Sequence, residues 1–216
     1  MTKTLFPGKS IALISGVLLI GISSLKITAQ TNDNSLPGWD RNVLVQANTG
    51  NSATYLSDEE KKVIFYTNLC RLKPKLFCQT VLADYLRDHT EKPSVVESLK
   101  KTLNEDKPRN ALIPDEELCK MSRTYAKKMG AEGKEGHLDF QNRIKPFMKR
   151  FNKVGENCDY GHSLALDAFM NLLIDSNEPT ILGHRKNILD VDFSVIGISC
   201  QPHKIFHWNY VMDFGG

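Results

Sequence analysis

The chain has 216 residues, of which 41% are hydrophobic and 25% are charged. These ordinary values favour one globular domain and argue against a disordered chain, a collagen or a multi-span membrane protein. The formal net charge is +3, and three lysines lie in the acid-free first thirty residues, so the rest of the chain is neutral. A neutral domain gives no electrostatic case for nucleic-acid binding, which needs clustered Lys and Arg.

Residues 1–29 have the order of a secretory signal peptide. Lys3 and Lys9 precede a run that is apolar or small from residue 11 to 22, and Ala29 is a small residue suited to cleavage. The run has about 12 residues, short of the roughly 20 that span a bilayer, so we expect cleavage rather than a retained anchor. The sequence therefore predicts an exported protein, periplasmic or extracellular, with no stable membrane span after cleavage.

Residues 30–56 are predicted to be a flexible linker. They are rich in Asn, Thr, Ser and Gly and show no helical periodicity. Residues 43–45 are the candidate for a short strand within this linker. The folded domain is then expected over residues 57–216.

Several helices are predicted from apolar residues that recur three and four positions apart. The first begins with a capping box, in which Ser57 caps the helix and Glu60 reaches back to it. Pro74 suits the first turn of the next helix, where its missing N–H costs nothing. Gly130 is expected to end the fourth. The predicted helices cover residues 57–71, 74–85, 93–103, 113–130, 141–151, 163–175 and 183–189.

The C-terminal part of the chain has the character of strands. Residues 193–200 and 205–214 are rich in β-branched and aromatic residues, and a turn at 201–204 separates them, which predicts a β-hairpin. Residues 154–158 are expected to form a further short strand. Because helices come first and strands last, we predict the α+β class, with an antiparallel sheet covered by helices.

The five cysteines all lie in the part of the chain that would be exported. Export permits disulfides, but the odd number leaves at least one cysteine free or paired between chains. Cys70 with Cys78 and Cys158 with Cys200 are plausible pairs, and burial as small hydrophobic residues is the alternative. The sequence contains no Cys-x-x-Cys motif, so the cysteine spacing does not indicate a zinc cluster.

Three polar residues that each follow a glycine carry the candidate chemistry: His137, Glu156 and His184. Two imidazoles and a carboxylate suit a divalent metal such as zinc, with one position open for water. They equally suit proton transfer, with Glu156 orienting a histidine. The two histidines are 47 residues apart, so no local geometry joins them. A structural hydrogen-bonding role for each is the alternative.

The order of these segments resembles the CAP superfamily, which comprises cysteine-rich secretory proteins, antigen 5 and plant pathogenesis-related proteins. The nearest likeness is to its bacterial, SCP-like extracellular branch, and it extends over residues 57–214. The resemblance implies an α-β-α sandwich with a small antiparallel sheet between helical layers. It also implies a surface cleft where two histidines and two acids meet. The segments that carry it are Arg71-x-x-Pro74, His137, Gly155-Glu156-Asn157, Gly183-His184-Arg185-Lys186-Asn187-Ile188-Leu189 and Ile196-Gly197-Ile198.

The resemblance places three cleft residues at His137, Glu156 and His184, with the two histidines as metal ligands. The fourth position, an acid in the animal members, falls at Leu172 in this chain. Asp175 lies one helical turn further on, where it either turns inward as a support or stays a surface acid at the helix end; we expect the latter.

Two further residues are candidate supports of the cleft. Asn157 is expected to hydrogen-bond the local backbone. Arg185 is expected to stabilise the fold, and pairing with an acid near the cleft is the alternative.

Two main classes of function follow from these residues. One is a secreted, non-enzymatic binding module whose cleft holds a divalent metal such as Zn²⁺, a lipid or a peptide, with a cell-envelope component as a further candidate partner. The alternative is a metal-dependent hydrolase or peptidase, with His137 and His184 as ligands and Glu156 as base; the missing fourth acid counts against it. A purely structural envelope role would need no working cleft. The chain lacks the Gly-x-Ser-x-Gly motif of serine hydrolases.

Overall fold

The computed structural model describes residues 36–177 and 180–216. The predicted signal peptide, residues 1–29, and the first part of the predicted linker lie outside the described residues. The chain from Ser35 to Gly216 forms one compact unit. Within the described ranges, no helix combines the length and the apolar character needed to cross a bilayer.

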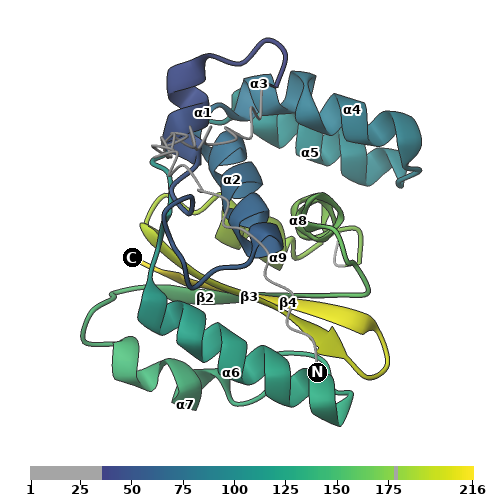
Figure 1. Ribbon diagram of the computed structural model, residues 1–216. Coiled ribbons are helices and arrows are strands. Elements are labelled where there is room, and N and C mark those ends of the chain that lie inside the picture. Colours follow the sequence, from purple (N-terminus) through teal and green to yellow (C-terminus); the bar gives the residue numbers. More distant parts are fainter. Residues whose placement is uncertain (1–35, 178–179) are drawn as a thin grey trace, which may run out of the picture. The chain divides into compact units, whose positions relative to one another are not determined.

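This unit has three layers, with a sheet between two groups of helices (Figure 1). One side of the sheet is covered by α6 (Glu116–Glu132) and α7 (Phe140–Ile144), and the other by the remaining helices. The α+β class and the α-β-α sandwich are therefore confirmed. The helices of the second layer are α1 (Arg41–Ala47), α2 (Asp58–Leu72), α3 (Pro74–Gln79), α4 (Val81–Asp88), α5 (Pro93–Glu105), α8 (Ala165–Ile174) and α9 (Gly183–Ile188).

The sheet is built on the predicted hairpin, β3 (Val195–His203) and β4 (His207–Gly215). β2 (Val154–Tyr160) pairs with β4 in antiparallel fashion and forms one edge of the sheet. The other edge is β1 (Ile113–Pro114), which runs parallel to β3, so the small sheet is mixed rather than purely antiparallel. This short strand occupies the start of the helix that we predicted over 113–130. The helix begins only after Asp115, whose side chain accepts from the Leu118 N–H at 2.9 Å.

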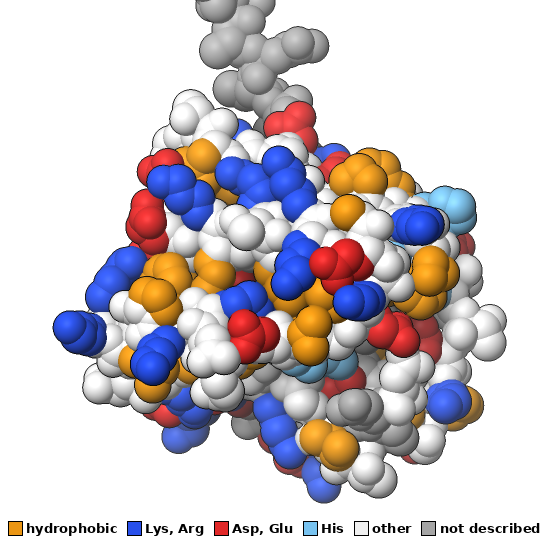
Figure 2. Space-filling model, turned by 90° about the horizontal axis from the view of Figure 1, so that it is seen from below, with side chains coloured by type: hydrophobic (Ala, Val, Ile, Leu, Met, Phe, Trp, Pro, Cys, Tyr) orange, Lys and Arg blue, Asp and Glu red, His pale blue; other side chains and the backbone are white. Residues whose placement is uncertain are grey.

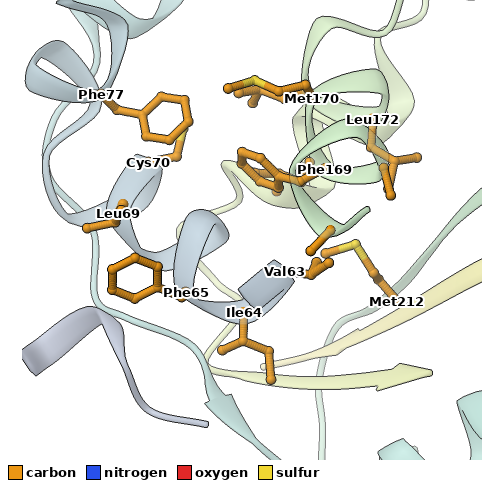
Figure 3. Packing of buried hydrophobic residues seen from close by; sticks show 14 of the residues in the cluster. Val63, Ile64, Phe65, Leu69, Cys70, Phe77, Phe169, Met170, Leu172 and Met212 are labelled. Atoms are coloured by element: carbon orange, nitrogen blue, oxygen red, sulfur yellow. The ribbon is translucent and has the colours of Figure 1, made fainter. Parts of the chain in front are cut away.

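The capping box at the start of α2 is confirmed. The Glu60 N–H donates to Ser57 Oγ at 3.3 Å, and the Ser57 N–H donates to Glu60 Oε2 at 2.8 Å. The buried face of α2 then packs against α8, where Phe169 lies across from Cys70 and Phe77 (Figure 3). The Phe77 and Phe169 rings meet edge to face, with centroids 5.8 Å apart. This contact anchors α8, the helix that leads into the His184 segment.

The flexible linker predicted over 30–56 is wrong for the part that the structure describes. This part contains α1, so the strand considered at residues 43–45 is wrong too. Asp40 caps α1 by accepting from the Asn42 N–H at 2.7 Å, and Trp39 and Ala47 are buried in the main core. With only seven residues, α1 is too short to show a clear apolar period.

Three predicted helices also differ from the structure at their boundaries. The helix predicted over 141–151 ends at Ile144 and is followed only by a short 3-10 turn, Lys145–Phe147. The helix predicted over 74–85 is interrupted at Thr80, whose φ of −120° and ψ of −86° lie outside the helical region. α6 continues through Gly130 and ends at Glu132, where Gly133 takes the left-handed conformation (φ 66°). Gly130 instead permits close packing, because an added Cβ would lie 2.1 Å from the Pro202 carbonyl oxygen.

Neither predicted disulfide is present. Cys158 on β2 lies opposite Val211, and Cys200 on β3 lies opposite Tyr210, with β4 between them. Successive residues of a strand point to opposite faces. The two cysteines are therefore on opposite faces and two strands apart, beyond the reach of a disulfide. The cysteines are instead unpaired and buried or half-buried, as the alternative predicted: Cys70, Cys78, Cys119, Cys158 and Cys200.

Candidate functional site

His137 lies in the loop between α6 and α7, and the peptide before it is held from two sides. Gly136 has a φ of 93°, a conformation that favours glycine. Its N–H donates to the Tyr160 hydroxyl at 2.9 Å, and its carbonyl accepts from the Tyr125 hydroxyl at 2.8 Å. Two tyrosines, from β2 and α6, thus fix the backbone that presents His137.

Glu156 on β2 forms the first half of the site with His137. Its Oε1 is 2.9 Å from His137 Nδ1. The Glu156 side chain is only 1% exposed, whereas the His137 ring is 48% exposed. The contact therefore joins a buried acid to an imidazole that reaches the surface.

Arg143 on α7 completes this half of the site and was missed by the sequence analysis. Its Nη1 donates to Glu156 Oε2 at 2.7 Å and its Nη2 to Oε1 at 2.9 Å, while the guanidinium lies 3.5 Å above the centre of the Tyr125 ring. Burial alone would raise the pKa of Glu156, but the hydrogen bonds from His137 and Arg143 outweigh it, so the pKa is lowered. Glu156 is therefore an ionised carboxylate with both oxygens engaged.

A second acid lies directly behind Glu156. Asp213 on β4 is its cross-strand partner. The Ser122 hydroxyl donates to Asp213 Oδ2 at 2.6 Å, but Oδ1 has no hydrogen-bond partner among the described residues. Burial, together with the negative charge of Glu156, raises the pKa of Asp213 well above its usual range. A proton on Asp213 would remove the repulsion between these two acids.

The Asp213→Asn variant is expected to be more stable than the wild type at about pH 7. In the unfolded chain an aspartate loses its proton near pH 4, whereas folded Asp213 keeps it to higher pH. The wild type therefore loses stability as pH rises through this window, and the amide variant does not. Urea unfolding at about pH 4 and pH 7 measures the difference, which should shrink at the lower pH. A variant that is less stable than the wild type by the same amount at both pH values would contradict this assignment.

Cys158 also lies against His137. Its Sγ is 3.7 Å from His137 Nδ1, the same nitrogen that Glu156 contacts. A nucleophilic Cys-His-acid arrangement would place the thiol and the acid on opposite ring nitrogens. The ligand atoms of His137, Glu156 and Cys158 instead lie within 4.8 Å of one another, a group that could hold a metal ion. Burial raises the pKa of the Cys158 thiol well above its usual range.

His184 forms the second half of the site with Asp175. Its Nδ1 is 2.9 Å from Asp175 Oδ1, and its backbone N–H donates to Oδ2 at 3.0 Å. Asp175 ends α8 in the left-handed conformation (φ 60°), and only 2% of the residue is exposed. The expectation of a surface acid at the helix end is therefore wrong. Asp175 turns inward because this conformation, which aspartate tolerates, directs its carboxylate to the start of α9.

The two candidate supports act on the same segment. Asn157 Nδ2 donates to the His184 carbonyl at 3.0 Å, so Asn157 binds the backbone of α9 rather than its own local backbone. Arg185 donates to the carbonyls of Leu173 at 3.0 Å and Ile174 at 2.7 Å, at the end of α8. These contacts of Arg185 join the end of α8 to α9.

A cavity of about 250 Å³ borders the edge strand β2. Asp175, His184 and Cys158 line it, and Cys158 also contacts His137. Leu172, at the position of the missing acid, is buried in the main core. Of the two histidine–acid pairs of the site, His184–Asp175 thus lines this cavity, and His137 of the other pair contacts Cys158 in its lining. The residues that line the cavity are Glu135, Cys158, Tyr160, Asn171, Asp175, Asn177, His184 and Phe206.

A comparison with known protein families shows to which family this chain belongs. The sequence model of the CAP family, described as the cysteine-rich secretory protein family, matches residues 84–214. The chain belongs to the CAP family. The match includes all three predicted cleft residues, His137, Glu156 and His184, and also Arg143 and Asp175.

Solved structures give more distant comparisons. The CAP chain is similar to an outer surface protein from Borrelia burgdorferi, with 25% identity over 56% of this chain and 86% of that chain and a TM-score of 0.41. It is also similar to a cysteine-rich secretory protein from Staphylococcus aureus, with 12% identity over 58% of this chain and 39% of that chain and a TM-score of 0.37. No curated protein matches significantly.

Proposed function

We propose that this chain is an exported CAP binding module that holds a divalent metal ion between His137 and His184. The observation that carries the proposal is that each imidazole has its Nδ1 against a buried acid, Glu156 or Asp175. Such an acid fixes the tautomer, directs Nε2 away from itself and makes the ring a better ligand, as around protein-bound zinc. The two acids then orient the ligands.

The residues of the site fit such an ion. Imidazole nitrogens suit Zn²⁺ and similar transition metals, and the half-exposed ring of His137 is accessible to solvent. With Leu172 in place of an acid, His137 and His184 would need water to complete the coordination shell. A bound ion would supply a Lewis-acidic centre at which an oxygen or nitrogen of a ligand replaces that water.

The surroundings of Glu156 favour binding over hydrolysis. A general base must have a free lone pair near the proton that it takes and a pKa close to the working pH. Arg143 and His137 engage both oxygens of Glu156, and its pKa is lowered. These contacts argue against Glu156 as the base of a hydrolase.

Zinc titration of the purified chain tests the proposed metal site. The His137→Asn and His184→Asn variants are each expected to bind Zn²⁺ at least about tenfold more weakly than the wild type, because each loses one ligand. His207→Asn is the matched control, since His207 is exposed on the hairpin and has a positive φ (68°) that Asn tolerates.

Two outcomes of this titration would contradict the metal site. One is equal Zn²⁺ affinity in the wild type and both site variants. The other is no binding by the wild type at millimolar Zn²⁺, measured by calorimetry on protein purified without a histidine tag.

Export is the second part of the proposal. It is supported by the basic, apolar and small-residue order of residues 1–29 and by membership of a family described as secretory. N-terminal sequencing of the protein made in its own cells should begin near Gln30. An intact Met1 on membrane-bound protein would contradict cleavage.

A further inference from the structure

The helical layer of α6 and α7 carries a concentrated positive charge. Residues 116–153 contain ten Lys and Arg but five Asp and Glu, a net charge of +5 in a chain whose total is +3. The rest of the chain is therefore net negative. Figure 2 looks onto this layer and shows Lys and Arg side chains spread between hydrophobic ones.

Four lysines on this layer are available to an external partner. Lys127, Lys128, Lys145 and Lys149 are exposed, and none is within 4.0 Å of an acidic group of the described residues. Arg143, by contrast, is engaged by Glu156. The positive charge without a close ion pair thus comes from lysines on α6 and on the turn that follows α7, although Lys128 also interacts with Glu132 on α6.

A largely apolar groove lies on the same layer; of these four lysines Lys128 lines it, and so do the acids Glu117 and Asp139. It has a volume of about 770 Å³, and α6 contributes Met121 and Tyr125 to it. The segment after His137 contributes Leu138, which is 51% exposed, together with Pro146 and Phe147. Met148, in the same turn, is also 51% exposed. Large apolar side chains are therefore presented to solvent on the same layer as these lysines.

We propose that this layer docks on the surface of a membrane that contains anionic lipids. Each Lys near such a surface contributes about 1 kcal/mol of attraction. A soluble polyanion would need only the lysines, whereas a bilayer interface also takes up exposed apolar side chains such as Leu138 and Met148. Leu138 directly follows His137, so docking would hold the His137 loop close to the lipid surface.

Cosedimentation of the full chain with vesicles tests this proposal. Vesicles of phosphatidylcholine with about 30% phosphatidylglycerol are compared with vesicles of phosphatidylcholine alone. Each comparison is made at low salt and at high salt, because high salt screens the attraction to the anionic surface. The wild type should prefer the anionic vesicles, and this preference should fall at high salt. A variant with Lys127, Lys128, Lys145 and Lys149 all changed to Gln should bind them at least about tenfold more weakly.

A matched control and a second variant make the test specific. Changing four exposed lysines of the other helical layer to Gln, at positions 75, 92, 100 and 101, should leave the affinity within about twofold. The Leu138→Ser/Met148→Ser variant, which changes exposed side chains, should also bind the anionic vesicles more weakly.

Three results would overturn the proposal. The first is that the wild type shows no preference for anionic vesicles. The second is that the two quadruple lysine variants lose affinity equally. The third is that the Leu138→Ser/Met148→Ser variant binds the vesicles as the wild type does, which would indicate a polyanion site in place of a lipid-docking surface.

Discussion

Replacing Arg71 with Met is expected to lower the free energy of unfolding by more than about 3 kcal/mol. Arg71 is fully buried, and burial lowers its pKa to about 10, so it still carries its charge at neutral pH. It donates to the carbonyls of Asn110 (3.0 Å), Ile188 (2.9 Å), Asp190 (2.7 Å) and Phe193 (2.9 Å). Methionine fills similar space but leaves these carbonyls without their donor, at about 1–3 kcal/mol for each that stays buried.

Arg87 offers a matched control for this variant. It is 71% exposed and pairs with Asp84 on the same helix, an arrangement that contributes little in water. Arg87→Met should change the free energy of unfolding by less than about 0.5 kcal/mol. Urea or guanidinium melts compare the two variants. If both variants lost similarly little free energy of unfolding, water would be replacing the Arg71 donors, and the expected cost of Arg71→Met would be wrong.

Leu173→Ala is expected to cost about 2–5 kcal/mol of stability. Leu173 lies on α8, has no exposed surface and belongs to the main core. Its truncation removes buried apolar surface and leaves a cavity between α8 and its neighbours. Leu164→Ala, at the start of the same helix, is the control, because Leu164 is 58% exposed. Denaturant melts should show a loss below about 0.5 kcal/mol for Leu164; an equally small loss for Leu173 would be inconsistent with its place in the core.

The parts of the fold that the sequence predicted well have local signals. The capping pair Ser57 and Glu60 lies within one turn, and the hairpin of residues 195–215 has β-rich segments on both sides of a turn. The short helix α1 has no such signal, because it is held by contacts such as that of the Asn68 amide with the Ala47 carbonyl. A contact between residues 21 positions apart leaves no periodicity in the sequence.

The site residues, like the fold, were predicted only where the sequence carries a local signal. Motif order indicated His137, Glu156 and His184, but not the groups that orient them. Arg143 reaches Glu156 only because the chain turns after His137 and brings α7 against β2. Asp175 lies three residues beyond Leu172, and its inward direction depends on a backbone conformation that the amino-acid type permits but does not dictate. The sequence alone therefore left Asp175 as one of two alternatives and did not indicate Arg143.

Asp175 compensates for the acid that the family pattern would place at Leu172. Leu172 strengthens the core of α8, while Asp175 supplies a carboxylate to His184 from the end of the same helix. The site therefore retains one buried acid for each imidazole. For this reason we propose a metal-binding cleft despite the departure from the family pattern at Leu172.

The most direct test of the metal-binding cleft is anomalous X-ray scattering at the zinc edge from crystals grown with Zn²⁺. We expect one zinc peak beside β2, with Nε2 of His137 and of His184 both about 2.0–2.1 Å from the ion and with Glu156 and Asp175 still at the Nδ1 atoms. A peak bonded to only one of the two histidines, or no peak near either of them, would contradict it.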